Sequence, residues 1–152
     1  MTSVRTSVYC PDSSFLLDYL DEDRSAAADA KAFLEAYAAR EYRIPAVVLF
    51  EVLRGGARLR GPAGVADLVE QLAWADPLPL TPAGAKEAAL IDGELKNAGD
   101  DINLGDVLIA GNVREAGGTV LNPRRPLRAG RRPRCRDLLI TDTDPLPVRV
   151  HK

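Results

Sequence analysis

Residues 9–16 read YCPDSSFL, in which a strand-like run ends at Asp12 and a helix-like run begins. Two further acids stand at the same kind of junction, Glu51 within the run VVLFEVL and Asp106 within the run LGDVLIA. A carboxylate among large apolar side chains is costly to bury unless a cation compensates its charge. We therefore expect the three acids to meet at one edge of an α/β sheet, where their oxygens would suit Mg²⁺ or Mn²⁺.

The length and composition indicate one domain that can bury a core, because 46% of the 152 residues are hydrophobic. No run approaches the roughly 18 apolar residues of a membrane span. The first residues also lack the apolar segment of a signal peptide. We therefore expect a cytoplasmic protein that does not enter a membrane.

The cysteine and histidine content excludes several kinds of site. Cys10 and Cys135 lack the spacing of zinc ligands, and two cysteines make no disulfide framework, so we expect free thiols. The single histidine is His151. Hydrolysis by a histidine acid–base pair is therefore excluded, which leaves carboxylates and a metal to carry catalysis.

Charge is distributed unevenly along the chain, although the formal net charge is only −2. Residues 1–115 carry 19 acidic and 11 basic side chains, whereas residues 116–152 carry 3 acidic and 9 basic ones. Residues 122–136 hold seven arginines and three prolines without helix or strand periodicity, and are predicted to form a loop or a disordered insert. We accordingly divide the chain into a core, residues 1–121, and a divergent C-terminal segment, residues 122–152.

Strand-like and helix-like segments alternate along the chain, which favours an α/β fold with a mainly parallel sheet. Thr81 before a proline, and Asn103, are typical helix starts, while Gly55 and Gly56 are expected to end the helix that carries Glu51. The predicted strands are residues 7–10, 44–47, 74–80 and 119–121, with short strands possible at 137–141 and 147–150. The other predicted helices are residues 13–20, 25–42, 62–72, 82–99 and 104–116.

Each acid also has a purely structural interpretation. Asp12 could cap the helix that follows it, Glu51 could pair with Arg54 one turn later, and Asp106 could share a capping arrangement with Asn103. The functional interpretation explains the three together, because open parallel sheets bind ligands at the carboxyl ends of their strands, where helix N-termini favour phosphate. Mg²⁺ held there would supply the activated water and the charge compensation that phosphodiester hydrolysis needs.

Three runs together resemble the PIN domain family, and more narrowly the VapC-type toxins of prokaryotic toxin–antitoxin systems. They are DSSFLLDYL from Asp12, IPAVVLFEVLRG from Ile44 and GDVLIA from Gly105, and the resemblance covers residues 7–121 in order and spacing. It implies a three-layer α/β/α sandwich with a mainly parallel sheet of four to five strands. It also implies an Mg²⁺- or Mn²⁺-dependent ribonuclease that cleaves RNA, forms a homodimer and is inhibited by a small cognate antitoxin.

The same resemblance assigns roles to individual residues. Asp12, Glu51 and Asp106 would be the catalytic residues and the metal ligands, and Ser13 or Ser14 would hydrogen-bond to the ligands.

The chain departs from the family pattern after Leu121. Members usually follow the fourth strand with a Thr-Arg-Asp or Thr-Asn-Asp turn, which delivers a fourth acid or amide to the metal, but no acid occurs here before Asp137. Asp142 or Asp144 could fold back as a late fourth ligand, although their separation from Asp106 is too long for the family. The arginines could instead bind RNA phosphates, or form a solvated basic loop, since no aromatic residues interleave to stack bases.

A shift of reading frame would explain this departure. The run NPRRPLRAGR from Asn122 can be encoded by DNA that reads TRDAHFERVD one base later, which is close to the family's ending. The nucleotide sequence of the gene tests this hypothesis, and the alternative is a divergent, arginine-rich loop.

The sequence therefore predicts a metal-dependent endoribonuclease that acts as the toxin of a VapBC-type pair. One alternative is a catalytically impaired PIN-like protein that retains antitoxin binding or dimerisation only. A second is a receiver-type signalling domain, which needs an early acidic pair and a lysine on a late strand. The lysines of the chain, Lys31, Lys86, Lys96 and Lys152, all lie outside the predicted internal strands.

Overall fold

The computed structural model describes residues 8–100 and 102–122, and its strands are all parallel. Strand β1 (Val8–Pro11) pairs with β4 (Gly118–Leu121), and β2 (Arg43–Pro45) pairs with β3 (Asp76–Leu78). A bridge between Tyr9 and Tyr42 joins the two pairs, so the strands follow the order β4, β1, β2, β3. The predicted parallel sheet is confirmed, with four short strands in the described part of the chain.

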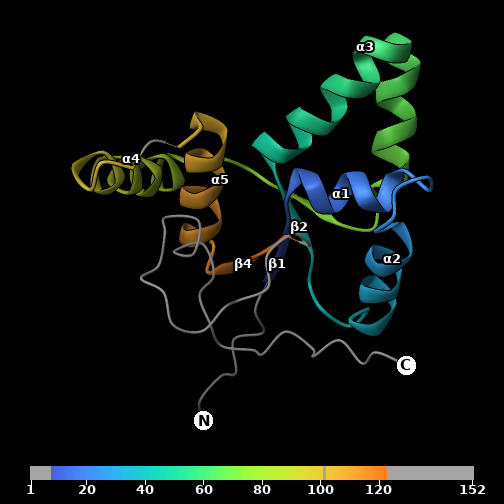
Figure 1. Cartoon of the computed structure of the whole chain (residues 1–152), viewed down its shortest axis with the longest axis horizontal. Coiled ribbons are helices and arrows are strands. Elements are labelled where there is room, and N and C mark those ends of the chain that lie inside the picture. The colour runs from blue at the N-terminus through green and yellow to red at the C-terminus, as the bar shows by residue number, and fades with distance from the viewer. Residues whose placement is uncertain (1–7, 101, 123–152) are drawn as a thin grey trace.

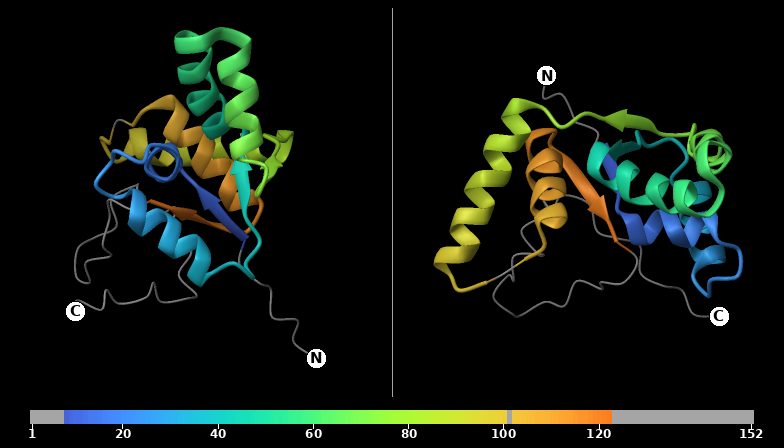
Figure 2. Two further views of the ribbon diagram at one scale, coloured as in Figure 1. Left: turned by 90° about the vertical axis from the view of Figure 1, so that its right-hand side faces the viewer. Right: turned by 90° about the horizontal axis from the view of Figure 1, so that it is seen from above.

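The helices lie on both sides of this sheet. Figure 1 shows α4 (Pro82–Asn97) and α5 (Leu104–Glu115) on one side of β1 and β4, and α1 (Ser13–Leu20) and α2 (Ala27–Ala36) on the other. The view from above in Figure 2 has the same arrangement. The expected three-layer α/β/α architecture is therefore confirmed. Helix α3 (Ala46–Gln71) projects from these layers as a bent arm.

The core has two parts. The larger is centred on the sheet and includes the fully buried side chains of Leu16, Ile44, Val48 and Val113. Burying a side chain of this kind contributes about 1.5–3 kcal/mol, so this part dominates the stability of the domain. A smaller apolar cluster holds α4 against α5, and is made by Ile91, Leu95 and Ala110 with the partly buried Ile102.

Local side-chain caps set three helix starts where the sequence places them. The Asp12 carboxylate accepts a hydrogen bond from the Phe15 amide at 2.9 Å. Thr81 accepts from the Gly84 amide at 3.1 Å, and Asn103 from the Gly105 amide at 2.7 Å. Each cap satisfies an amide that has no partner within its own helix, so the predicted starts of α1, α4 and α5 are confirmed.

Helix α3 differs from the prediction that Gly55 and Gly56 end the helix of Glu51. The helix continues through both glycines and bends only at Gly61, whose φ of 59° and ψ of −143° are not helical, before Pro62 starts the second half. Gly56 serves the packing of the two halves instead. A Cβ atom on Gly64 would lie only 2.4 Å from the Gly56 carbonyl oxygen, so the backbones meet without side chains between them.

Two further elements are shorter than predicted because aromatic packing interrupts them. Helix α2 ends at Ala36 instead of residue 42, since Tyr42 bridges to Tyr9 and donates from its hydroxyl to the Tyr37 carbonyl at 2.9 Å. Strand β3 begins at Asp76 instead of residue 74, and the Trp74 ring packs against aromatic neighbours.

The expectations for the C-terminal segment concern residues outside the described ranges. They include the arginine-rich stretch 122–136 beyond its first residue, Cys135, the candidate strands, and the candidate ligands Asp142 and Asp144. Within residues 8–100 and 102–122, no helix has the length and apolar character needed to span a membrane.

Candidate active site

Asp12 lies where β1 ends and α1 begins, as the sequence predicts. Its backbone amide donates to the Leu121 carbonyl at 3.1 Å, which links this turn to the end of β4. Its Oδ1 caps α1, so the predicted capping role of Asp12 is confirmed. A carboxylate can accept several hydrogen bonds or ligand contacts, and the cap therefore orients this acid without using up its coordinating capacity.

Glu51 lies in the second turn of α3, just beyond the carboxyl end of β2. Its Oε2 accepts a hydrogen bond from the Ser13 hydroxyl in the first turn of α1, 38 residues earlier in the chain. The alternative ion pair between Glu51 and Arg54, both within the described residues, is not formed. The Arg54 guanidinium instead lies over the Phe50 ring, 5.6 Å from its centroid. Of the two serines expected to hydrogen-bond to the acids, Ser13 is the one that makes such a bond.

Asp106 lies half-buried in the first turn of α5, directly after Gly105. A Cβ atom on Gly105 would lie 3.0 Å from Oε1 of Glu51 and 3.2 Å from Oδ1 of Asn103. The absence of a side chain at Gly105 therefore lets the Glu51 carboxylate approach the start of α5. This role of Gly105 was not predicted, since its signal in the sequence is only a glycine inside the motif that contains Asp106.

The structure thus gathers the starts of α1, α3 and α5 at one edge of the sheet. The two contacts of Glu51, with Ser13 and beside Gly105, bring together segments that are far apart in the sequence. Helix N-termini carry partial positive charge, so α1 and α5 both favour an anion at this edge.

The residues of this edge fit a hard divalent cation by their chemistry, since Asp12, Glu51 and Asp106 offer only oxygen donors. In their present positions they do not form a ligand shell. Across residues 8–100 and 102–122, no three acidic, histidine or cysteine side chains come close enough to hold one ion between them. Carboxylates repel one another when no cation is between them, so closing on a metal requires side-chain movement. Metal ligation by the three acids stays a prediction.

Cys10 adjoins this edge on β1 but is not a candidate nucleophile. Its side chain is fully buried, and burial raises the pKa of the Cys10 thiol to about 12. Because the thiolate is the reactive form, this cysteine is inert at neutral pH.

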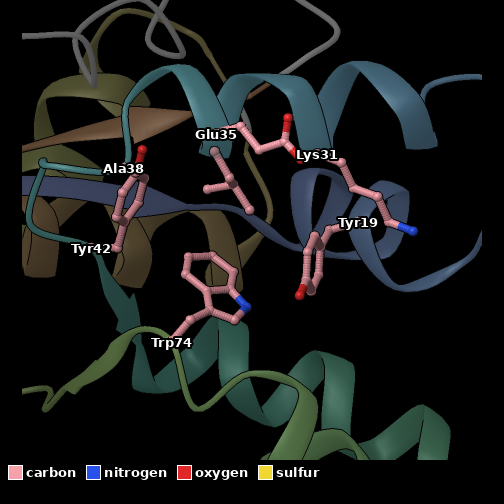
Figure 3. A pocket seen from close by; sticks show the side chains of 7 residues that line it. Tyr19, Lys31, Glu35, Ala38, Tyr42 and Trp74 are labelled. Carbon is pink, nitrogen blue, oxygen red and sulfur yellow. The ribbon is translucent and has the colours of Figure 1, made fainter.

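A second feature is a pocket of about 500 Å³ at the far end of α1. Figure 3 shows the Trp74 ring between Tyr19 and Tyr42, below α2, which carries Lys31 and Glu35. The Trp74 ring centroid lies 5.4 Å from that of Tyr19 and 5.6 Å from that of Tyr42. The indole Nε1 of Trp74 is buried and has no hydrogen-bond partner among the described residues. The pocket is thus aromatic and has Glu35 and Lys31 at its rim, where Lys31 is paired with Glu22 at 3.0 Å.

The PIN domain family model matches residues 9–122, which is most of the chain. The chain belongs to the PIN domain family. A comparison with curated protein sequences found no match. The family assignment confirms the resemblance carried by the three acidic motifs and includes all three acids.

Solved structures of toxin–antitoxin proteins have the same fold as this PIN domain. VapBC2 from Rickettsia felis, bound to a promoter DNA fragment, has 16% identity and a TM-score of 0.63, over 74% of this chain and 84% of that chain. FitAcB from Neisseria gonorrhoeae has 22% identity and the same TM-score of 0.63, again over 74% and 84%. VapC20 from Mycobacterium tuberculosis, a toxin that cleaves the sarcin–ricin loop, has 15% identity and a TM-score of 0.58, over 78% and 92%.

Proposed function

We propose that this PIN domain is a metal-dependent endoribonuclease, the toxin of a VapBC-type pair, acting in the cytoplasm. The observation that carries the proposal is the position of Glu51, hydrogen-bonded to Ser13 and set against Gly105. Through these contacts the acid-bearing starts of α1, α3 and α5 adjoin at the carboxyl edge of a parallel sheet. The fold family and the toxins among its structural neighbours agree with this assignment.

In this proposal Asp12, Glu51 and Asp106 would hold Mg²⁺ or Mn²⁺. When bound, the ion would lower the pKa of a water molecule and offset charge on the scissile phosphate. Ser13 orients the Glu51 carboxylate, and the cap to Phe15 orients that of Asp12. The N-termini of α1 and α5 add favourable electrostatic interactions with the RNA phosphate.

Cleavage of total RNA by the purified protein, with Mg²⁺, Mn²⁺ or EDTA, tests the proposal. Asp12→Asn and Glu51→Gln should abolish metal-dependent cleavage, and asparagine still caps α1, so the first variant keeps its fold. Glu70→Gln, at an exposed acid in the second half of α3, is the matched control and should cleave normally. Cleavage retained by both site variants would contradict the assignment.

The second candidate is a catalytically impaired PIN domain that retains only antitoxin binding or dimerisation. It is favoured by the departure from the family pattern after Leu121, where no acid occurs before Asp137 to supply a fourth group. A folded protein that cleaves RNA in none of the three arms would establish this alternative. Binding of Mn²⁺, measured by calorimetry with Asp106→Asn as control, then shows whether the acids still hold a metal.

We further propose that a small antitoxin binds this chain and that the chain forms a homodimer. The neighbouring VapBC2 and FitAcB structures provide the precedent for a two-component complex. The pocket around Trp74 offers the antitoxin an apolar surface lined by the aromatic rings of Tyr19, Tyr42 and Trp74. Trp74 is the single tryptophan of the chain, so its fluorescence reports directly on this pocket.

Titration with a candidate antitoxin protein should shift the Trp74 emission, and Lys31→Ala, at the rim, should weaken binding. An unchanged emission on complex formation would place the antitoxin elsewhere. Sedimentation velocity of the protein alone tests the homodimer.

A further inference from the structure

The first half of α3 carries an exposed stripe that begins beside Glu51. Phe50, Arg54 and Arg58 follow one another at intervals of four residues, which places them on one face of the helix. All three are exposed, and the Phe50 side chain is 61% exposed. The buried Val48 and Val52 lie on the opposite face, so the stripe points away from the core.

The charge of this stripe is not balanced by nearby acids. Glu51 is the only acid between residues 46 and 60. Arg60 is paired with Asp67, but neither Arg54 nor Arg58 forms an ion pair with any described residue. The contact of Arg54 is with the Phe50 ring, where its guanidinium lies 5.6 Å from the ring centroid. An exposed aromatic ring and two uncompensated cations therefore lead away from Glu51 in a line.

An exposed aromatic ring beside two cations is typical of surfaces that bind single-stranded nucleic acid. Single-stranded nucleic acids are bound by basic side chains that contact the backbone together with aromatic rings on which bases stack. The arginine-rich residues 122–136 contain no aromatic residue, whereas the stripe on α3 contains one next to the candidate active site. Successive members are four residues apart, or about 6 Å along the helix axis, so one short stretch of RNA can reach all three.

We propose that Phe50, Arg54 and Arg58 form the track that positions single-stranded RNA at this site. Phe50 stacks on a base beside the scissile phosphate, and the two arginines contact phosphates further along the strand. The inference rests on the proposed ribonuclease function, because Glu51 is the reference point from which the track begins. It adds the residues outside the acidic site that would hold the strand, and the direction in which the strand leaves the site.

The test measures binding of a labelled single-stranded RNA to the full chain by fluorescence anisotropy over a range of salt concentrations. Phe50→Ala should weaken binding between about 5- and 150-fold at every salt concentration, as expected for the loss of one stacked base. Phe50→Trp should restore it. Arg54→Ala and Arg58→Ala should each reduce the slope of log affinity against log salt by about 0.7, the value for one phosphate contact.

Two variants serve as controls. Leu59→Ala removes a side chain that is 86% exposed on the same half of α3, and Lys86→Ala removes an exposed cation on α4. Both should leave affinity and salt slope unchanged. A duplex RNA of the same sequence should bind more weakly than the single strand, since its bases cannot stack on Phe50.

The possible results distinguish a failure of the proposed RNA track from a failure of the proposed ribonuclease function. If the wild-type protein cleaves RNA while the three stripe variants bind with unchanged affinity and slope, the track is wrong and the ribonuclease stands. If the wild-type protein neither binds nor cleaves RNA, both fall. If Phe50→Ala instead dissociates a dimer in sedimentation velocity, without loss of RNA affinity per protomer, the stripe is a subunit contact and the inference is overturned.

Discussion

The Ser13 hydroxyl donates a hydrogen bond to Oε2 of Glu51, which joins the start of α1 to the second turn of α3. The two residues are 38 positions apart, and each belongs to a helix that begins at the carboxyl end of a neighbouring strand. A flexible glutamate held by such a bond keeps one orientation, which the proposed role of Glu51 as a metal ligand requires. Substitutions at either end of this bond therefore test whether the orientation of Glu51 matters for activity.

Removing the Ser13 hydroxyl should impair the site without unfolding the protein. We expect Ser13→Ala to lower metal affinity or cleavage about 10- to 100-fold, the usual effect of losing a group that orients a ligand. Ser14→Ala is the matched control, because Ser14 follows Ser13 in the same helical turn and makes no hydrogen bond to the acids. Wild-type activity in both variants would show that the orientation of Glu51 does not depend on the hydrogen bond from Ser13.

Adding a methyl group at Gly105 should displace Glu51. The new Cβ would lie 3.0 Å from Oε1, and the carboxylate cannot move away freely because Ser13 holds its other oxygen. Cleavage by Gly105→Ala should fall about 10- to 100-fold, with little change in the thermal midpoint. In Gly93→Ala nothing lies within 4 Å of the new Cβ, so activity should be kept and stability should rise by about 0.5–1 kcal/mol. Normal cleavage by Gly105→Ala would argue against the position of Glu51.

The glycines of α3 should respond differently to the same substitution. Gly64→Ala places a Cβ 2.4 Å from the Gly56 carbonyl oxygen and should cost about 1–3 kcal/mol, because backbone cannot yield as a side chain does. Gly55→Ala meets nothing within 4 Å and should be neutral or stabilising. Urea denaturation of both variants measures the difference. Equal stability would mean that the two halves of α3 do not pack as closely as described.

Stability should fall in alkaline solution partly through Cys10. Burial raises the pKa of this thiol from its ordinary value of 9.0 to about 12 in the folded state. Between these values the unfolded chain loses the proton and the folded chain keeps it, so the free energy of unfolding decreases as pH rises. The loss per pH unit approaches about 1.4 kcal/mol for one proton.

Urea denaturation at pH 8 and pH 10 measures this loss. Cys10→Ala is the control and should lose less stability over the same interval, with Cys135 present in both proteins. Parallel pH profiles for the two proteins would show that Cys10 ionises equally in both states.

The helix starts were correctly predicted because their determinants are local. Asp12, Thr81 and Asn103 each cap a backbone amide two or three residues away, so the interaction depends on no other part of the chain. The alternation of strands and helices is similarly local, and it was enough to predict a parallel α/β fold and to place three acids at helix starts.

The misjudged boundaries depend on contacts between distant segments. Gly55 and Gly56 have the composition of a helix end, yet the helix continues because the second half of α3 packs on Gly56 and stabilises it. Tyr42 has helical spacing with the residues before it, yet bridging to Tyr9 takes it into the sheet. Local preferences differ by about 1 kcal/mol or less for residues such as these, so packing readily overrides them.

The candidate site also has some features that depend on local sequence and others that depend on contacts between distant segments. The residue types and their positions after strands sufficed to propose Asp12, Glu51 and Asp106, because parallel strands present their carboxyl ends at one edge. The choice of Ser13 over Ser14, and the approach of Glu51 to Gly105, depend on the relative placement of three helices. That placement follows from how the side chains of the core fill space together, which no single segment of the sequence contains.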